Sequence, residues 1–114
     1  MDNMDKLAVV WTSGDKEVAE KVVFLYTQGA KTQGWFDEVV LIVWGPSARM
    51  LAGDVSLQKK VVELMDAGVT VRACRVCTEQ YGVTSELEVL GLDVLPMGGP
   101  LTDYLKEDWK VLTF

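Results

Sequence analysis

The chain has 114 residues, with Gly and Pro too sparse for a low-complexity segment, so we expect a single domain over residues 1–114 without a linker. Its 11 basic and 17 acidic residues give a net charge of −6, which argues against binding to nucleic acid or to an anionic membrane surface. Histidine is absent, and this excludes a Ser-His-Asp triad, a Cys-His dyad and a His-ligated zinc site built from one chain.

The first half of the chain predicts two strands joined by a helix. Residues 7–11 are apolar and form the first expected strand, and Ser13 or Asp15 can cap the helix that follows. Residues 39–44 are apolar at every position, so we place this strand in the centre of the sheet, buried on both faces. At i, i+4 spacing, the helix should bury a stripe made of Val18, Val22, Tyr26 and Ala30.

The second half continues the alternation of strands and helices. Five short strands separated by helical segments predict an α/β fold, a three-layer α/β/α domain with a mainly parallel five-stranded sheet. The remaining expected elements are a short helix after Pro46, a helix capped by Ser56 that stops at Gly68, a strand at 69–73 ending at Cys74, a helix at 86–90 that begins with a capping box at 85–88, a strand at 92–95, a helix opened by Pro100, and a strand or tail at 109–114.

The chain's only two cysteines, Cys74 and Cys77, follow the third expected strand. Ligands and reacting groups collect beyond the carboxyl ends of parallel strands, and a helix that begins here would favour the nucleophilic thiolate. Arg72 and Arg75 flank the cysteines and should stabilise that thiolate in an otherwise acidic protein. Cysteines three residues apart at a helix start are within side-chain reach, so a disulfide or a shared sulfur transfer is feasible.

Other interpretations of these residues remain open at this point. Cysteine is often a small buried hydrophobe, and two sulfurs make only half of a zinc site. The turn at 12–15 could cradle a phosphate, although a capped turn is more typical of its residues. Trp11 and Trp44 could flank a flat cofactor, but aromatic residues at strand ends are more often core residues. We therefore expect no metal and no cofactor.

The order and spacing of several short motifs resemble the DsrE/DsrF-like family over nearly the whole chain. The motifs are Trp44-Gly45-Pro46-Ser47, Val71-Arg72-Ala73-Cys74-Arg75-Val76-Cys77, Tyr81-Gly82-Val83, Met97-Gly98-Gly99-Pro100-Leu101-Thr102 and the closing residues 109–114. The resemblance implies an α/β/α fold with a five-stranded sheet, assembly into trimers or hexamers, and a role in sulfur relays. In that family a cysteine just after the third strand holds a sulfane sulfur; Cys74 matches it by position, and Cys77 is an additional thiol.

We therefore expect a sulfur-carrier or persulfide-relay protein that takes sulfur from a donor protein and delivers it to an acceptor protein. Cys74 would be the nucleophile, and Cys77 a resolving or second acceptor thiol. The start of the chain lacks the pattern of a signal peptide and no apolar run approaches membrane-spanning length, so we expect a cytoplasmic location. Two alternatives are a thiol–disulfide or redox-sensing protein, and a non-catalytic small-ligand or interaction module with structural cysteines.

Overall fold

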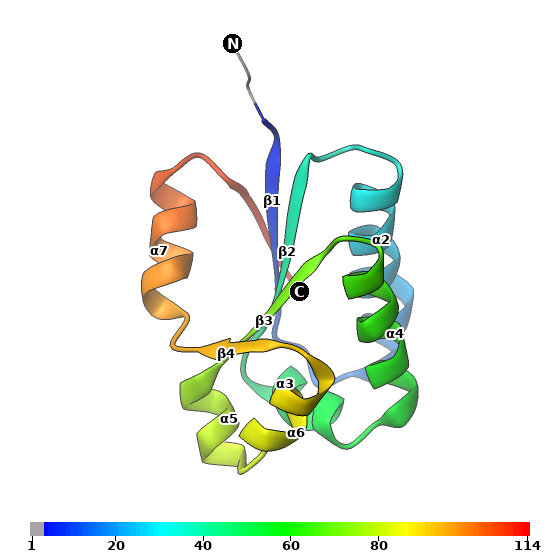
Figure 1. Ribbon diagram of the computed structural model, residues 1–114, viewed down its shortest axis with the longest axis vertical. Coiled ribbons are helices and arrows are strands. Elements are labelled where there is room, and N and C mark those ends of the chain that lie inside the picture. The colour runs from blue at the N-terminus through cyan, green and yellow to red at the C-terminus, as the bar shows by residue number, and fades with distance from the viewer. Residues whose placement is uncertain (1–3) are drawn as a thin grey trace.

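The computed structural model describes residues 4–114, and its five strands form one parallel sheet in the order β4-β3-β2-β1-β5 (Figure 1). The central strand is β2, as its uninterrupted apolar sequence predicted. Because every strand runs the same way, all five carboxyl ends meet at one edge of the sheet. The strands are β1 (Lys6–Trp11), β2 (Glu38–Val43), β3 (Thr70–Cys74), β4 (Asp93–Leu95) and β5 (Lys110–Thr113).

Helices cover both faces of the sheet and crowd its carboxyl edge. Figure 1 shows α2 and α4 on one face, α7 alone on the other, and α3, α5 and α6 together at the end where the strands terminate. The predicted three-layer α/β/α architecture is confirmed. The helical segments are α1 (Lys16–Val18), the π-helical η1 (Ala19–Val23), α2 (Phe24–Thr32), α3 (Pro46–Ala52), α4 (Val55–Asp66), α5 (Arg75–Tyr81), α6 (Thr84–Leu90) and α7 (Gly98–Lys106). In the part of the chain that the structure describes, no helix is long and apolar enough to cross a membrane.

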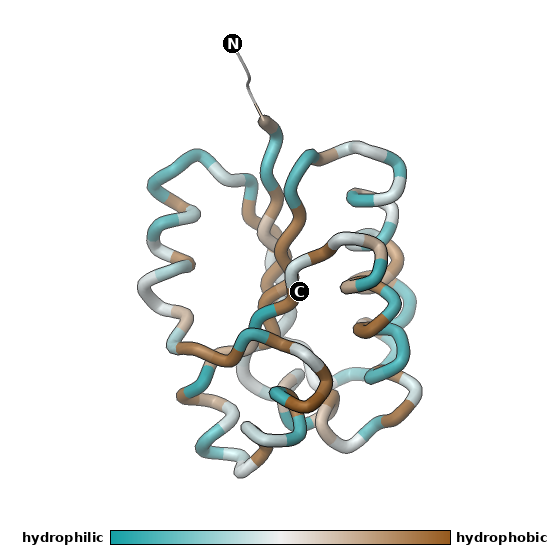
Figure 2. The backbone as a smooth tube through the Cα atoms, in the orientation of Figure 1, coloured by the Kyte–Doolittle hydropathy of each residue, from teal (hydrophilic) through white to brown (hydrophobic). Residues whose placement is uncertain are grey.

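The buried side chains form two clusters, one on each face of the sheet. Alternation along β1 sends Val9 to the larger cluster beneath α2 and α4, and Val10 to the smaller cluster beneath α7. Figure 2 shows the most apolar residues concentrated in the central strands. Cys74 belongs to the smaller cluster and therefore packs on the α7 face of the sheet.

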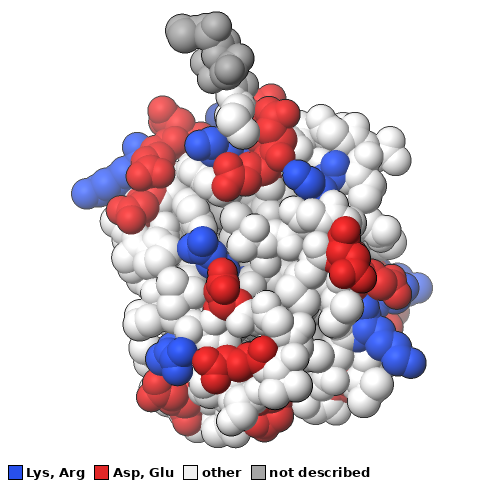
Figure 3. Space-filling view, viewed as in Figure 1, with Lys and Arg blue, Asp and Glu red and all other residues white. Residues whose placement is uncertain are grey.

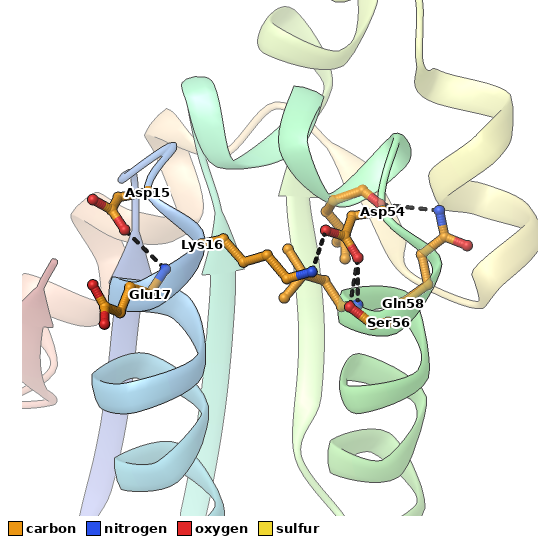
Figure 4. Close-up of polar contacts among 8 residues, drawn as sticks. Asp15, Lys16, Glu17, Asp54, Ser56 and Gln58 are labelled. Atoms are coloured by element: carbon orange, nitrogen blue, oxygen red, sulfur yellow. Dashed lines mark hydrogen bonds and ion pairs between the residues drawn. The ribbon is translucent and has the colours of Figure 1, made fainter.

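Helix α4 is capped by Asp54, and the prediction that Ser56 caps it is wrong. The Asp54 Oδ1 atom accepts a hydrogen bond from the Leu57 backbone N–H at 3.1 Å, and the Ser56 hydroxyl donates to the same carboxylate at 2.7 Å. Lys16, at the start of α1, approaches the other carboxylate oxygen at 3.0 Å (Figure 4). Asp54 is the N-cap residue because its backbone is extended, as this position requires, whereas Ser56 already lies within the helix.

The buried face of the helix between β1 and β2 agrees only in part with the predicted stripe. Ala30 is fully buried, and Val18 and Tyr26 pack half-buried against the core, but Val22 is 40% exposed. Ala19, Val23 and Thr27 are fully buried as well. Asp15 caps this helix, and the π-helical turn η1 that follows holds an additional residue in its hydrogen-bonded ring. This local geometry rotates the face that meets the sheet.

Two further helix starts differ from the predictions. Helix α6 begins at Thr84 with no side-chain cap, so the predicted capping box at 85–88 does not form. Glu88, which would have closed that box, approaches Arg75 instead. Helix α7 begins at Gly98 rather than Pro100, because the Leu101 N–H donates to the Met97 carbonyl. Proline is tolerated within this first turn, where its missing N–H would have no partner in the helix.

Candidate functional site

The carboxyl ends of β1 and β2 are joined by a buried hydroxyl that positions the start of α3. Ser47 Oγ donates to the Trp11 carbonyl oxygen and accepts from the Trp44 N–H at 3.2 Å. Ser47 is fully buried, so these bonds are made away from solvent, where leaving them unmade would be costly. The turn at Gly45 and the first residues of α3 are thereby held at the sheet edge.

Both cysteines are free thiols, and they differ in burial. Cys74 ends β3 and occupies the N-cap position of α5, with a side chain that is 3% exposed. Cys77 lies in the first turn of α5, is half-buried, and packs with Trp44 against the cluster that contains Cys74. A reagent in solution therefore meets Cys77 more readily than Cys74.

The surroundings of Cys77 favour its protonated form. Burial raises the pKa of the Cys77 thiol, and a hydrogen bond from the Gly45 backbone partly opposes that rise. The charge of the neighbouring Cys74 and a hydrogen bond to its sulfur raise the pKa of Cys77 further. The net result of burial and of the neighbouring Cys74 is a raised pKa for Cys77.

Position 45 requires glycine because of its backbone conformation, not because a side chain there would clash with a neighbour. Its φ of 72° and ψ of −139° lie in a region that only glycine adopts readily. A Cβ atom built there would meet nothing within 4 Å. This turn places the Gly45 backbone beside Cys77. The role of Gly45 was not predicted from the sequence. A glycine that precedes a proline and follows a fully apolar strand was the pattern that could have indicated it.

The flanking arginines lie against acceptors other than the cysteine sulfurs. The Arg72 Nε is 3.9 Å from an Asp93 carboxylate oxygen, and the same guanidinium opposes the rise that burial imposes on the pKa of Tyr104. Arg75 Nη2 donates to the Val94 carbonyl at 2.7 Å and lies 3.4 Å from Glu88. The structure thus brings the two cysteines together and directs both guanidinium groups toward β4 and its surroundings.

Two loops at the carboxyl ends of strands contribute to the cysteine surroundings, and a third does not. The loops at 45–47 and 97–100 contribute Gly45 and the fully buried Met97. The turn at 12–15 uses its first two N–H groups on the Phe114 carbonyl and its aspartate as a helix cap. Trp11 is fully buried edge-on against Phe24, as a core residue. Within residues 4–114, no three His, Cys, Asp or Glu side chains converge in a metal-binding group.

Comparisons with known proteins agree with this fold. The model of the DsrE/DsrF-like family matches residues 5–114. The conserved protein BT1422 of unknown function from Bacteroides thetaiotaomicron is 36% identical, with a TM-score of 0.93 over 96% of this chain and 95% of that one. The ychN protein from E. coli shares the fold at 18% identity, with a TM-score of 0.74 over 97% of this chain and all of its own. No curated protein matches the sequence significantly.

Proposed function

Because the chain belongs to the DsrE/DsrF-like family, a sulfur-relay family, we propose that it carries a sulfane sulfur as a persulfide on Cys74. The observation that supports this choice of cysteine is its position: Cys74 ends β3 at the N-cap of α5, where the family resemblance places the sulfur-carrying cysteine. Burial raises the pKa of the Cys77 thiol and favours its protonated form, so the thiolate that attacks a donor is assigned to Cys74.

The proposed loading step is a displacement at sulfur. The Cys74 thiolate attacks the outer sulfane sulfur of the donor and forms a new S–S bond. The bond between that sulfur and the rest of the donor breaks, and the donor leaves with the electron pair. Delivery repeats the step, with an acceptor thiolate attacking the outer sulfur and Cys74 leaving as a thiolate.

Cys77 offers a second outcome for the bound sulfur. Once deprotonated, it attacks the inner sulfur of the persulfide, which forms a Cys74–Cys77 disulfide and releases hydrosulfide with the electron pair. The raised pKa of Cys77 slows this reaction near neutral pH and so lengthens the lifetime of the carrier. Arg72 and Arg75 contact neither sulfur, so their proposed stabilisation of the thiolate acts through long-range charge.

The burial of Cys74 favours small donors. With 3% of the residue exposed, only a compact sulfane sulfur reaches Sγ in this conformation. The donor and acceptor proteins, assembly into a trimer or hexamer, and a cytoplasmic location stay predictions.

Intact-mass spectrometry of cysteine variants tests the proposal. After exposure to a small sulfane donor without air, the wild type should gain the mass of one sulfur, Cys74→Ser should gain none, and Cys77→Ser should load and retain the sulfur longer. Equal loading of both variants would assign the wrong cysteine, and no loading of the wild type by any donor would reject the carrier function.

The placement of two free thiols at the junction of β3 and α5 also favours a second candidate, a thiol–disulfide protein. Such a protein should lose both thiols together under mild oxidant and show a defined reduction potential. Loss of both thiols without any sulfur loading would replace the carrier proposal with this one.

A further inference from the structure

Arg49 is an exposed cation on α3 that is held over an aromatic ring. Its Cζ lies 5.4 Å from the centroid of the Tyr81 ring, a contact in which the guanidinium keeps its charge while losing much of its mobility. The chain's other two arginines pair with Asp93 and Glu88, whereas Arg49 has no carboxylate partner within residues 4–114. The seam between α3 and α5 therefore carries a positioned and uncompensated positive charge.

The aromatic residue that holds this charge lies one helical turn from Cys77 along α5. Tyr81 follows Cys77 by four residues on α5, and Arg49 follows Gly45 by four residues on α3. Residues four apart share a helix face and lie about 6 Å apart along its axis. The Gly45 backbone lies beside Cys77, and Arg49 lies over Tyr81. These two pairs join α3 and α5 one helical turn apart.

The acidic residues of the neighbouring helices are directed elsewhere. Helix α3 contains none. On α5, Glu79 is two residues from both Cys77 and Tyr81, which places it on another face of the helix. On α6, Glu88 lies against Arg75, and Glu86 lines a hollow beside the end of α3.

We propose that Arg49, held on Tyr81, selects small anionic sulfane donors, such as thiosulfate or inorganic polysulfide, over neutral ones at the cysteine pair. With a net charge of −6, the molecule as a whole repels anions, so a local cation has a large influence on which donors approach. For thiosulfate, Arg49 attracts the charged oxygens while the Cys74 thiolate attacks the outer sulfur, and sulfite leaves with the electron pair. The sulfur chemistry in this inference rests on the proposed function, whereas the selection of anions by Arg49 does not.

Alkylation with two reagents of similar size and different charge tests the selection. Iodoacetate is an anion and iodoacetamide is neutral, and both modify accessible thiolates. In Arg49→Gln, the ratio of the iodoacetate rate to the iodoacetamide rate should fall about three- to tenfold at low ionic strength. Arg49→Lys should retain most of the ratio, and high salt should remove the difference between wild type and Arg49→Gln.

Lys106→Gln is the matched control, because it removes the same charge from an exposed residue at the far end of α7. The inference is overturned if Lys106→Gln lowers the ratio as much as Arg49→Gln, or if Arg49→Gln leaves the ratio unchanged. An equal change in both rates would indicate altered folding around Cys77 and would also overturn it. If the ratio falls but no donor loads sulfur, the proposed function fails and the anion selectivity stands.

Discussion

Arg75 anchors β4, which is an edge strand of the sheet. Strand β4 has three residues and pairs on one side only, with β3. The Arg75 guanidinium donates to the Val94 carbonyl of this strand at 2.7 Å. Because β4 makes only three residue pairs with β3, a hydrogen bond from a charged donor on α5 adds a further attachment for this short strand. At the residue scale, Arg75 is therefore a structural residue as well as a neighbour of the cysteines.

Replacing Arg75 should loosen this edge. Arg75→Ala should lower the free energy of unfolding by about 1 kcal/mol, since a charged donor is lost but its side chain is 38% exposed. Urea unfolding measures the change, and hydrogen exchange should show faster exchange in β4. Glu88→Gln is the control: it removes only the 3.4 Å ion pair and should cost less than about 0.5 kcal/mol. If both variants lost the same free energy of unfolding, the hydrogen bond from Arg75 to β4 would not be what stabilises this strand.

Asp54 joins two helices at their amino-terminal ends. Its carboxylate caps α4 and pairs with Lys16 at the start of α1 (Figure 4). Hydrogen bonds from Ser56, Lys16 and the Leu57 backbone lower the pKa of Asp54 from 3.8 to about 2. At the scale of elements, one ionised side chain therefore orders the first turn of α4 and connects it to α1.

The stability that Asp54 contributes should depend on pH in a defined direction. A lowered pKa in the folded state means that the contribution is complete above about pH 4 and is lost as the pH falls toward 2. Asp54→Ala should therefore lower the melting temperature by a few degrees at pH 6, with the difference from wild type shrinking between pH 4 and 2. Ser56→Ala, which leaves the carboxylate in place, should have the smaller effect. A difference from wild type that stays constant down to pH 2 would contradict this assignment.

Several large apolar side chains remain on the surface of the whole molecule. Val89 on α6 and Val55 on α4 are 86% and 66% exposed, and they line two adjoining hollows between these helices. On the face in Figure 3, acidic and basic side chains lie beside one another, with wide uncharged areas between them. Exposed apolar patches on a small domain favour self-association, because association removes them from water.

We expect the protein to be a homo-oligomer. Light scattering coupled to gel filtration at micromolar concentration should give a mass of several chains, with three or six as the numbers that the family resemblance implies. The mass of a single 12.6 kDa chain, unchanged on concentration, would reject this expectation.

The local pattern of the sequence by itself determined the fold class and the central position of β2. Residues 39–43 are apolar at every position because both faces of that strand are covered, and such a pattern needs no knowledge of neighbours. The helix starts were less predictable. Ser56 and Asp54 are both good caps, and only the path of the chain between α3 and α4 decided which one takes the extended backbone.

The strand-end position of the two cysteines was likewise readable from the sequence, since a CxxC spacing at a strand-to-helix junction keeps the thiols within reach. Their surroundings required the tertiary structure. Gly45 and Arg49 reach the cysteine helix from α3, and Arg75 turns to the Val94 carbonyl on β4. These contacts join residues that are 19 to 32 positions apart, so they depend on strand order and on which helices meet at the carboxyl edge. Periodicity and capping signals encode only neighbours within a few residues, and the packing of the sheet and its helices brought the distant ones together.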